Sequence, residues 1–295
     1  MGARPARRAA GGAGGGIELL TNPALARLHP TGTHPERKDR LAVLGGTTVE
    51  RQVTEEQVTR VHTTRYLDLL RSIEHATLLE TDTLASETSW EAALLAAGIA
   101  LEAVDRGGFA LVRPPGHHAL ADRAMGFCLL NNVAIAARYA QAELGVERLA
   151  IVDFDVHHGN GTEEAFLGDD SVFFCSLHQW PFYPGTGGPG TGDATTLNVP
   201  LPAGAEDSEF LAAFDELVEP AVRSFEPELM LVSAGFDAHF EDPLGGLALS
   251  EGCFRELGAR CAALAPRLAA VLEGGYNLAT LPRLVASAHA GFTGS

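Results

Sequence analysis

The sequence predicts an α/β protein with a mostly parallel central sheet that is flanked by helices. Short apolar runs of β type alternate with helical patterns along the chain, as in folds with a covered parallel sheet. The 295 residues suit one large domain, and 46% of them are hydrophobic, which is enough to build a sizeable core. We find no internal repeat and no linker, so we expect a single domain.

Five apolar runs have the length and composition of buried strands. They cover residues 109–113, 148–156, 172–178, 229–237 and 268–276. Helices are predicted where apolar residues recur every three or four positions, at 89–105, 129–144, 207–224, 250–264 and 279–289. Two interpretations of the start remain open: residues 17–20 (IELL) form the first strand, or the edge of the sheet is abbreviated.

Composition limits the classes of partner. The formal net charge of −17 argues against nucleic acid and anionic membranes, and it favours basic substrates. The four cysteines form no C-x-x-C pair, so we expect small core residues and no disulfides. The chain lacks an apolar signal segment and a run of transmembrane length, so we expect a cytoplasmic protein. We expect the Gly/Ala-rich residues 1–16 to form a flexible tail.

Polar residues gather where the predicted strands end. Four strands end in segments that combine glycine with histidine, acidic residues or tyrosine, namely RPPGHHA (113–119), DFDVHHGNG (153–161), SAGFDAH (233–239) and LEGGYN (272–277). The fifth runs into a loop rich in aromatic residues and glycine, residues 176–188. Open parallel sheets bind ligands at the carboxyl ends of their strands, where loops converge. These segments therefore predict one site at that edge.

The segment 152–157 predicts a metal centre. Side chains alternate along a strand, so Asp153, Asp155 and His157 should share one face, opposite their apolar neighbours. Burying adjacent carboxylates is costly unless a cation or donors compensate. Asp155 and His157 supply an oxygen and a nitrogen, which suits zinc, and Asp237 is the best candidate for a third ligand. Three ligands leave a position open for water or substrate.

The chain resembles the zinc-dependent histone deacetylase family in seven motifs: HPTGTHPERKDRL (29–41), RPPGHHA (113–119), GFCLLNNVAIAA (126–137), DFDVHHGNGTEEAF (153–166), FYPGTG (182–187), SAGFDAHFEDPLGG (233–246) and LEGGYN (272–277). They occur in the family's order. Asn160 and the DPLGG run resemble the class II branch and bacterial deacetylase-like amidohydrolases. The resemblance implies an arginase–deacetylase type catalytic domain over residues 17–295, one zinc ion per chain, and hydrolysis of acetyl or other short acyl groups on lysine.

The resemblance also implies roles for individual residues. His118 corresponds to the main general base and acid. His117 corresponds to the histidine that assists it electrostatically. By motif position Asp153 orients His117 and Asn160 orients His118. Because asparagine is neutral, His118 should be readily deprotonated. Tyr276 corresponds to the tyrosine that stabilises the oxyanion.

Further correspondences concern the substrate channel and a second cation. The channel residues are Gly126, Phe127, Phe182, Tyr183 and Leu244, with Asp82 as a rim carboxylate and Arg40 on an exit route for acetate. The matching monovalent-cation site, usually occupied by potassium, uses the carbonyls of Asp153, Asp155, His157 and Leu177 and the hydroxyl of Ser176. The expected substrate is an acyl-lysine peptide or protein, or a small acetylated amine.

Three alternatives use the same motifs differently. The two-manganese arginase branch needs carboxylates where this chain has Gly159 and His239, so one metal is expected. An acetylpolyamine hydrolase of the polyamine-selective branch carries a glutamate where this chain has Leu244, but the acidic composition keeps the polyamine alternative open. A catalytically inactive acyl-lysine binder should lack a ligand, histidine or tyrosine, and none is missing.

His158, next to the ligand His157, is expected to be structural.

Overall fold

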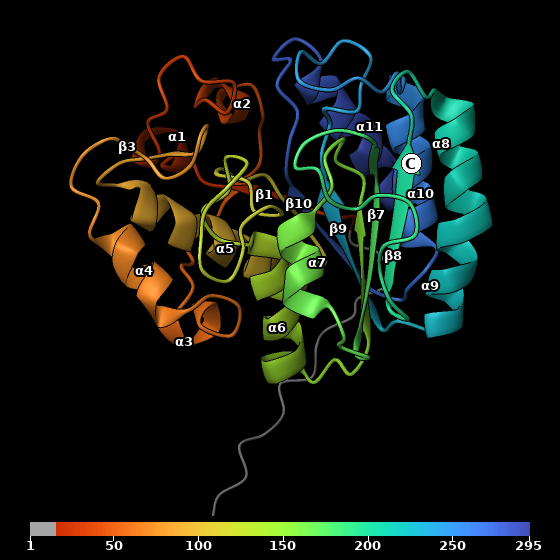
Figure 1. Cartoon of the computed structure of the whole chain (residues 1–295), viewed down its shortest axis with the longest axis horizontal. Helices are drawn as coiled ribbons and strands as arrows, with labels where there is room; N and C mark the ends of the chain where they lie inside the picture. Colours follow the sequence, from red (N-terminus) through yellow and green to blue (C-terminus); the bar gives the residue numbers. More distant parts are fainter. Residues whose placement is uncertain (1–15) are drawn as a thin grey trace, which may run out of the picture.

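The fold is built on an eight-stranded sheet in which every neighbouring pair of strands is parallel (Figure 1). The computed structural model describes residues 16–295, and the rest of the expected tail lies outside them. The strand order is β2-β1-β5-β10-β9-β6-β7-β8. The strands are β1 (Leu19–Thr21), β2 (Thr47–Thr48), β5 (Phe109–Ala110), β6 (Leu149–Asp153), β7 (Val172–Gln179), β8 (Thr196–Leu201), β9 (Leu229–Ala234) and β10 (Leu268–Leu272).

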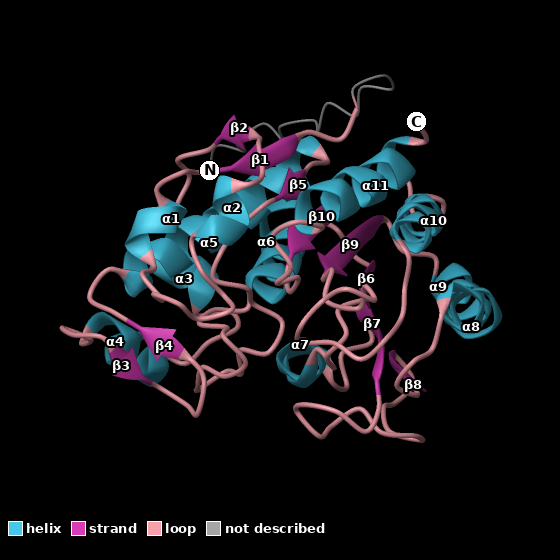
Figure 2. Ribbon diagram, turned by 90° about the horizontal axis from the view of Figure 1, so that it is seen from above, coloured by secondary structure: helices cyan, strands magenta, loops and turns pink. Residues whose placement is uncertain are grey.

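Helices cover both faces of this sheet (Figure 2). One face carries α5 (Ser89–Arg106), α6 (Asn132–Leu144) and α7 (Asn160–Phe166). The other carries α10 (Glu251–Ala262) and α11 (Leu281–Thr293), with α8 (Asp207–Ala213), the π-helical η1 (Phe214–Val218) and α9 (Glu219–Phe225) beside α10. Across residues 16–295, no helix combines the length and the apolar character that a membrane crossing requires.

Smaller elements lie beyond α5. They are the short helices α1 (Leu25–Leu28), α2 (Asp39–Ala42), α3 (Glu55–Val58) and α4 (Thr64–Arg71), and the antiparallel pair β3 (Thr77–Leu78) and β4 (Leu84–Ala85). Helix α2 reaches the carboxyl edge of the main sheet, because its Arg40 donates to backbone carbonyls just after β10. This part of the chain therefore contributes to the site described below.

The structure confirms the predicted fold class and corrects several element boundaries. Strands β6, β9 and β10 end three to four residues before their predicted ends, so the polar motifs lie on loops beyond the sheet. Residues 207–224, predicted as one helix, are interrupted by η1. Of the two interpretations of the start, the first holds, because β1 includes two of the four residues in IELL. The edge strand β8 was missed because it contains Pro200, which is tolerated at a sheet edge.

One hydrophobic core joins the sheet to the helices that cover it. Phe154, just after β6, packs edge-on against Phe236 and against Phe254 of α10, with ring centroids 6.3 and 6.2 Å away. Phe154 thus packs against helix α10. The four cysteines are free and buried, which confirms them as core residues.

A buried ion-pair network joins the first loops to the sheet. Glu36, Arg40 and Arg113 are fully buried. Arg113 holds both carboxylate oxygens of Glu36, with Nε 2.9 Å from Oε1 and Nη2 2.7 Å from Oε2, and Arg40 Nη1 lies 3.4 Å from Oε1. Burial raises the pKa of Glu36, but the Arg113 charge and hydrogen bonds outweigh it and lower that pKa to about 2.

Replacing Glu36 with glutamine should lower the free energy of unfolding at pH 7 by about 3–5 kcal/mol, because two buried guanidinium groups lose their carboxylate. A depressed pKa stabilises the fold above the unfolded value of 4.5, and this contribution disappears as the pH falls towards 2. The difference in the free energy of unfolding between wild type and variant, measured in urea, should therefore shrink as the pH falls through that window. The exposed-pair control Glu219→Gln should change stability by less than about 1 kcal/mol. A Glu36→Gln effect as small as the control's would contradict the account.

Candidate active site

Asp155, His157 and Asp237 converge beyond the carboxyl ends of β6 and β9. These strands are neighbours in register, with Asp153 opposite Ser233, so the loops that follow them start side by side. His157 Nδ1 lies 3.0 Å from Asp155 Oδ1 and 3.3 Å from Asp237 Oδ2. One potential ligand atom from each residue lies within 4.8 Å of the others. The three residues predicted to hold a metal are thus brought together.

The hydrogen bonds around these carboxylates leave one buried oxygen without a partner. Backbone N–H groups of Val156 and Gly274 donate to Asp237 Oδ1 and Asp155 Oδ2, at 3.0 and 2.8 Å. Asp237 Oδ2 is buried and has no hydrogen-bond partner, since the approach of His157 lacks hydrogen-bond geometry. Burial and the charge of Asp155 raise the pKa of Asp237. A divalent cation with oxygen and nitrogen ligands fits this set.

Two glycines let the carboxylates approach each other. A Cβ atom on Gly274 would lie 2.0 Å from Asp237 Oδ2 and 2.5 Å from Asp155 Oδ2. A Cβ atom on Gly235 would lie 2.2 Å from Asp155 Oδ2. Any larger residue at these positions would displace a predicted ligand.

The tandem histidines lie beside this cluster, each with a partner on Nδ1. His117 Nδ1 is 2.9 Å from Asp153 Oδ2, and His118 Nδ1 is 2.7 Å from Asn160 Oδ1. The two rings are 4.0 Å apart. The structure therefore pairs each histidine with the residue that motif position assigned to it.

These surroundings give the two histidines opposite charge states. Burial lowers the pKa of His117, but the carboxylates of Asp153 and Asp155 outweigh burial and raise it to about 10. Burial lowers the pKa of His118 well below its usual value, and the charges of His117 and His157 lower it further. A neutral His118 that donates Nδ1–H to Asn160 keeps an unprotonated Nε2, which can accept a proton.

Tyr276 lies on a loop that is held from two sides. Its N–H donates to Asp242 Oδ2 at 2.6 Å, and Arg40 Nε donates to the carbonyl of Gly275 at 2.7 Å. The Arg40 guanidinium lies 4.9 Å from the centre of the Tyr276 ring. Gly275 has φ +113°, which a residue with a side chain rarely adopts. Arg40 is thus placed behind Tyr276, and it does not line the pocket described next.

A pocket of about 200 Å³ leads to these groups. Its lining residues are Asp82, His118, Gly126, Phe127, His157, Tyr183, Leu244 and Tyr276. The Phe127 ring meets Tyr276 edge-on at 5.7 Å, and the Tyr183 ring meets His118 edge-on at 5.3 Å. Phe182, predicted as part of the channel, is absent from the lining and stacks on His157, with the centroids 5.2 Å apart.

The remaining predicted residues have clear positions. Ser176 and Leu177 lie in β7, where Ser176 pairs in register with Asp153. His158 is buried, with Nδ1 2.8 Å from Thr186 Oγ1 and Nε2 2.9 Å from Glu163 Oε2, which suits a structural role.

The sequence reasoning gave no role to Asp242 or Glu273, although both lie within quoted motifs. Asp242 accepts a hydrogen bond from the backbone of the loop that carries Tyr276 (residues 273–277, the tyrosine loop). Glu273 accepts hydrogen bonds from the backbone of the turn that carries the tandem histidines (residues 116–118, the histidine turn). A signal was present for Glu273, because an acidic residue directly follows the fully buried strand β10.

Comparison with known proteins gives one family. The profile of the histone deacetylase domain matches residues 25–292. Histone deacetylase 10, chloroplastic, from Oryza sativa subsp. japonica is 47% identical over 234 residues, which is 72% of this chain and 53% of that protein. A probable deacetylase from Archaeoglobus fulgidus is 40% identical over 278 residues, covering 83% and 77%. The chain spans about half the length of the chloroplastic relatives that it matches.

A solved structure agrees with these sequence matches. The crystal structure of the HDA15 HD domain superposes with a TM-score of 0.90 at 34% identity and covers 95% of this chain and 89% of that chain. The domain match, the identities and the shared fold agree with the pocket geometry. The chain belongs to the histone deacetylase family.

Proposed function

We propose that the protein is a zinc-dependent deacylase that removes acetyl or other short acyl groups from lysine side chains of proteins or peptides. The observation that carries this proposal is the end of the pocket. There His118 and Tyr276 share the lining with His157, which lies against Asp155 and against the buried, unpartnered Oδ2 of Asp237. Family membership supports the same reaction class.

The reaction is hydrolysis of an amide. Asp155, His157 and Asp237 would hold a zinc ion, which would act as a Lewis acid on the acyl carbonyl and lower the pKa of water. His118 takes a proton from the attacking water through Nε2 and later gives it to the amine nitrogen as the C–N bond breaks. Acetate and the free lysine amine are the products.

Two further residues stabilise the negative charge that develops during the reaction. His117, kept protonated by Asp153, offsets negative charge that develops beside it. The Tyr276 hydroxyl donates to the carbonyl oxygen as it becomes an oxyanion. Their effect is greatest in the transition state, which is where stabilisation raises kcat.

The pocket walls favour an alkyl stem. Phe127 and Tyr183 supply aromatic surface, and Leu244 offers no charge to a distal ammonium group. An acyl-lysine side chain fits this description better than a polyamine. An acetylpolyamine is the second candidate, because the carboxylate of Asp82 also lines the pocket and the net charge is −17.

The second cation and the cellular location stay predictions. A structural potassium ion is supported by the register pairing of Ser176 with Asp153, which places two of its predicted ligand residues on adjacent strands. We expect a cytoplasmic location on the sequence argument alone; two relatives are named chloroplastic.

The purified protein should hydrolyse an acetyl-lysine fluorogenic peptide and be inhibited by hydroxamates. His118→Ala should lower kcat by about 100- to 10,000-fold through loss of the base, and Tyr276→Phe by about 100-fold or more through loss of the oxyanion donor. The controls His75→Ala, at an exposed position, and Tyr139→Phe, which loses a bond to Asp105, should keep wild-type kcat. Stoichiometric zinc without turnover of any acyl-lysine or acetylpolyamine would contradict the enzymatic proposal.

A side-by-side assay decides between the two substrate classes. Acyl-lysine peptides of varied chain length should give a higher kcat/KM than acetylated polyamines, because Leu244 cannot bind an ammonium group. Leu244→Glu should shift this ratio towards polyamines, while Leu244→Met, which adds no charge, should not. A wild-type preference for polyamines would replace the first candidate by the second.

A further inference from the structure

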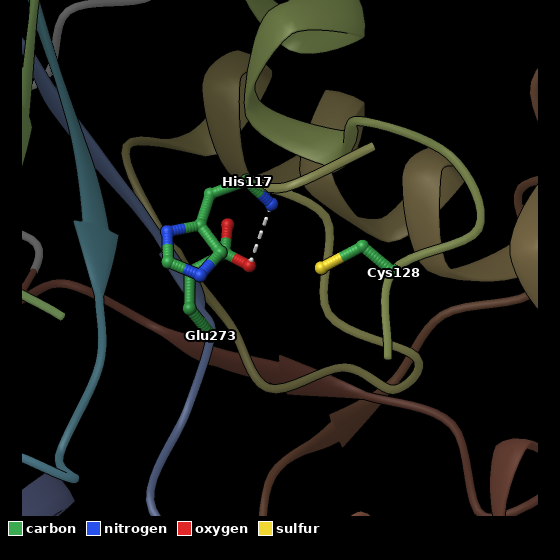
Figure 3. Close-up of side chains that lie close together, drawn as sticks. All are labelled: His117, Cys128 and Glu273. Atoms are coloured by element: carbon green, nitrogen blue, oxygen red, sulfur yellow. Dashed lines mark hydrogen bonds between the residues drawn. The ribbon is translucent and has the colours of Figure 1, made fainter. Parts of the chain in front are cut away.

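Three fully buried side chains form a second cluster beside the active site. His117, Cys128 and Glu273 offer potential ligand atoms that lie within 4.8 Å of one another (Figure 3). Their hydrogen bonds are already made. Glu273 Oε2 accepts the N–H groups of Gly116 and His117, at 2.7 and 3.1 Å, and the Cys128 thiol donates to the carbonyl of Gly126 at 3.3 Å. The Glu273 carboxylate and the Cys128 thiol are therefore already bound to backbone groups, which does not favour an ion there.

Glu273 connects two loops that are far apart in sequence. Its backbone begins the tyrosine loop directly after β10: its N–H donates to the carbonyl of Ala234 at 3.0 Å, and its carbonyl accepts Arg40 Nη2 at 2.5 Å. The next N–H along the chain, of Gly274, donates to Asp155 Oδ2. Its side chain instead reaches the turn that carries the tandem histidines, as the dashed contact to His117 N shows (Figure 3).

We propose that Glu273 is a positioning residue, whose carboxylate fixes the histidine turn at a set distance from the tyrosine loop and the metal ligands. This inference rests on the proposed deacylase function. Glu273 is not among the residues that line the pocket, so it acts through others. Positioning matters because a displacement of about 1 Å at an active site can cost about 100-fold in rate.

The acceptor has no obvious substitute. The two N–H groups would be buried and unpaired without the carboxylate, which is costly for backbone donors. Burial raises the pKa of Glu273 to about 7, so the reach of its oxygen matters more than its charge. A side chain with an oxygen at the same reach should keep the turn in place, and a shorter one should release it.

Three substitutions in the full chain separate reach from charge. Glu273→Gln keeps an oxygen at the same distance, Glu273→Asp keeps the charge but withdraws it by one methylene, and Glu273→Ala removes both. The aspartate and alanine variants should lower kcat on the acetyl-lysine peptide by about 100-fold, with KM and one-to-one zinc content unchanged. The glutamine variant should stay within about tenfold of wild type. The control Glu143→Asp shortens a carboxylate on α6 and should not change kcat.

A second readout does not depend on turnover. Amide hydrogen exchange of Gly116 and His117, followed by NMR, should be slow in wild type and Glu273→Gln and fast in Glu273→Asp. Wild-type kcat in the aspartate variant, or a glutamine variant as impaired as the aspartate one, would overturn the proposal. An inactive wild type with slow exchange at both amides would refute the deacylase function, but it would support the proposal that Glu273 holds the histidine turn. If the alanine variant does not fold, the aspartate and glutamine variants carry the test.

Discussion

The site depends on two carboxylates that the fold buries against each other. Asp155 and Asp237 follow adjacent parallel strands, and Gly235 and Gly274 leave no side chain to separate them. Backbone N–H groups donate to both oxygens of Asp155 and to one oxygen of Asp237, which fixes their orientation, but Asp237 Oδ2 is left without a partner. Two buried carboxylates with an unpaired oxygen are unfavourable in an apolar interior unless a cation binds. A metal would therefore stabilise the fold as well as serve the reaction.

The same concentration of negative charge sets the states of the surrounding groups. It keeps His117 protonated, and that positive charge in turn helps to keep His118 neutral. The neutral Asn160 orients His118 without adding a carboxylate that would favour protonation. The partners of the two histidines thus help to raise the pKa of one and leave the other low, which suits the separate roles proposed for them.

Much of this could be predicted from sequence, for identifiable reasons. Polar residues at several strand ends indicated a common edge, and Asp155, His157 and Asp237 meet there as expected. Strand alternation does not account for the positions of Asp155 and His157, because β6 ends at Asp153 and the later residues are not in a strand. Sequence could not show that Phe182 stacks on His157 while its neighbour Tyr183 lines the pocket. It also could not show that Glu273 reaches a turn 157 residues earlier, because such contacts depend on packing between distant segments.

The most direct test of the central claim is anomalous diffraction at the zinc absorption edge, on zinc-equilibrated crystals of the wild type and of Asp237→Ala. The wild type should show one strong peak, between Asp155, His157 and Asp237, with no peak at the His117, Cys128 and Glu273 cluster. The variant should lose that peak, while the control Asp215→Ala, which alters an exposed ion pair, should keep it. An empty wild-type site, a peak at the other cluster, or a full peak in Asp237→Ala would contradict the account.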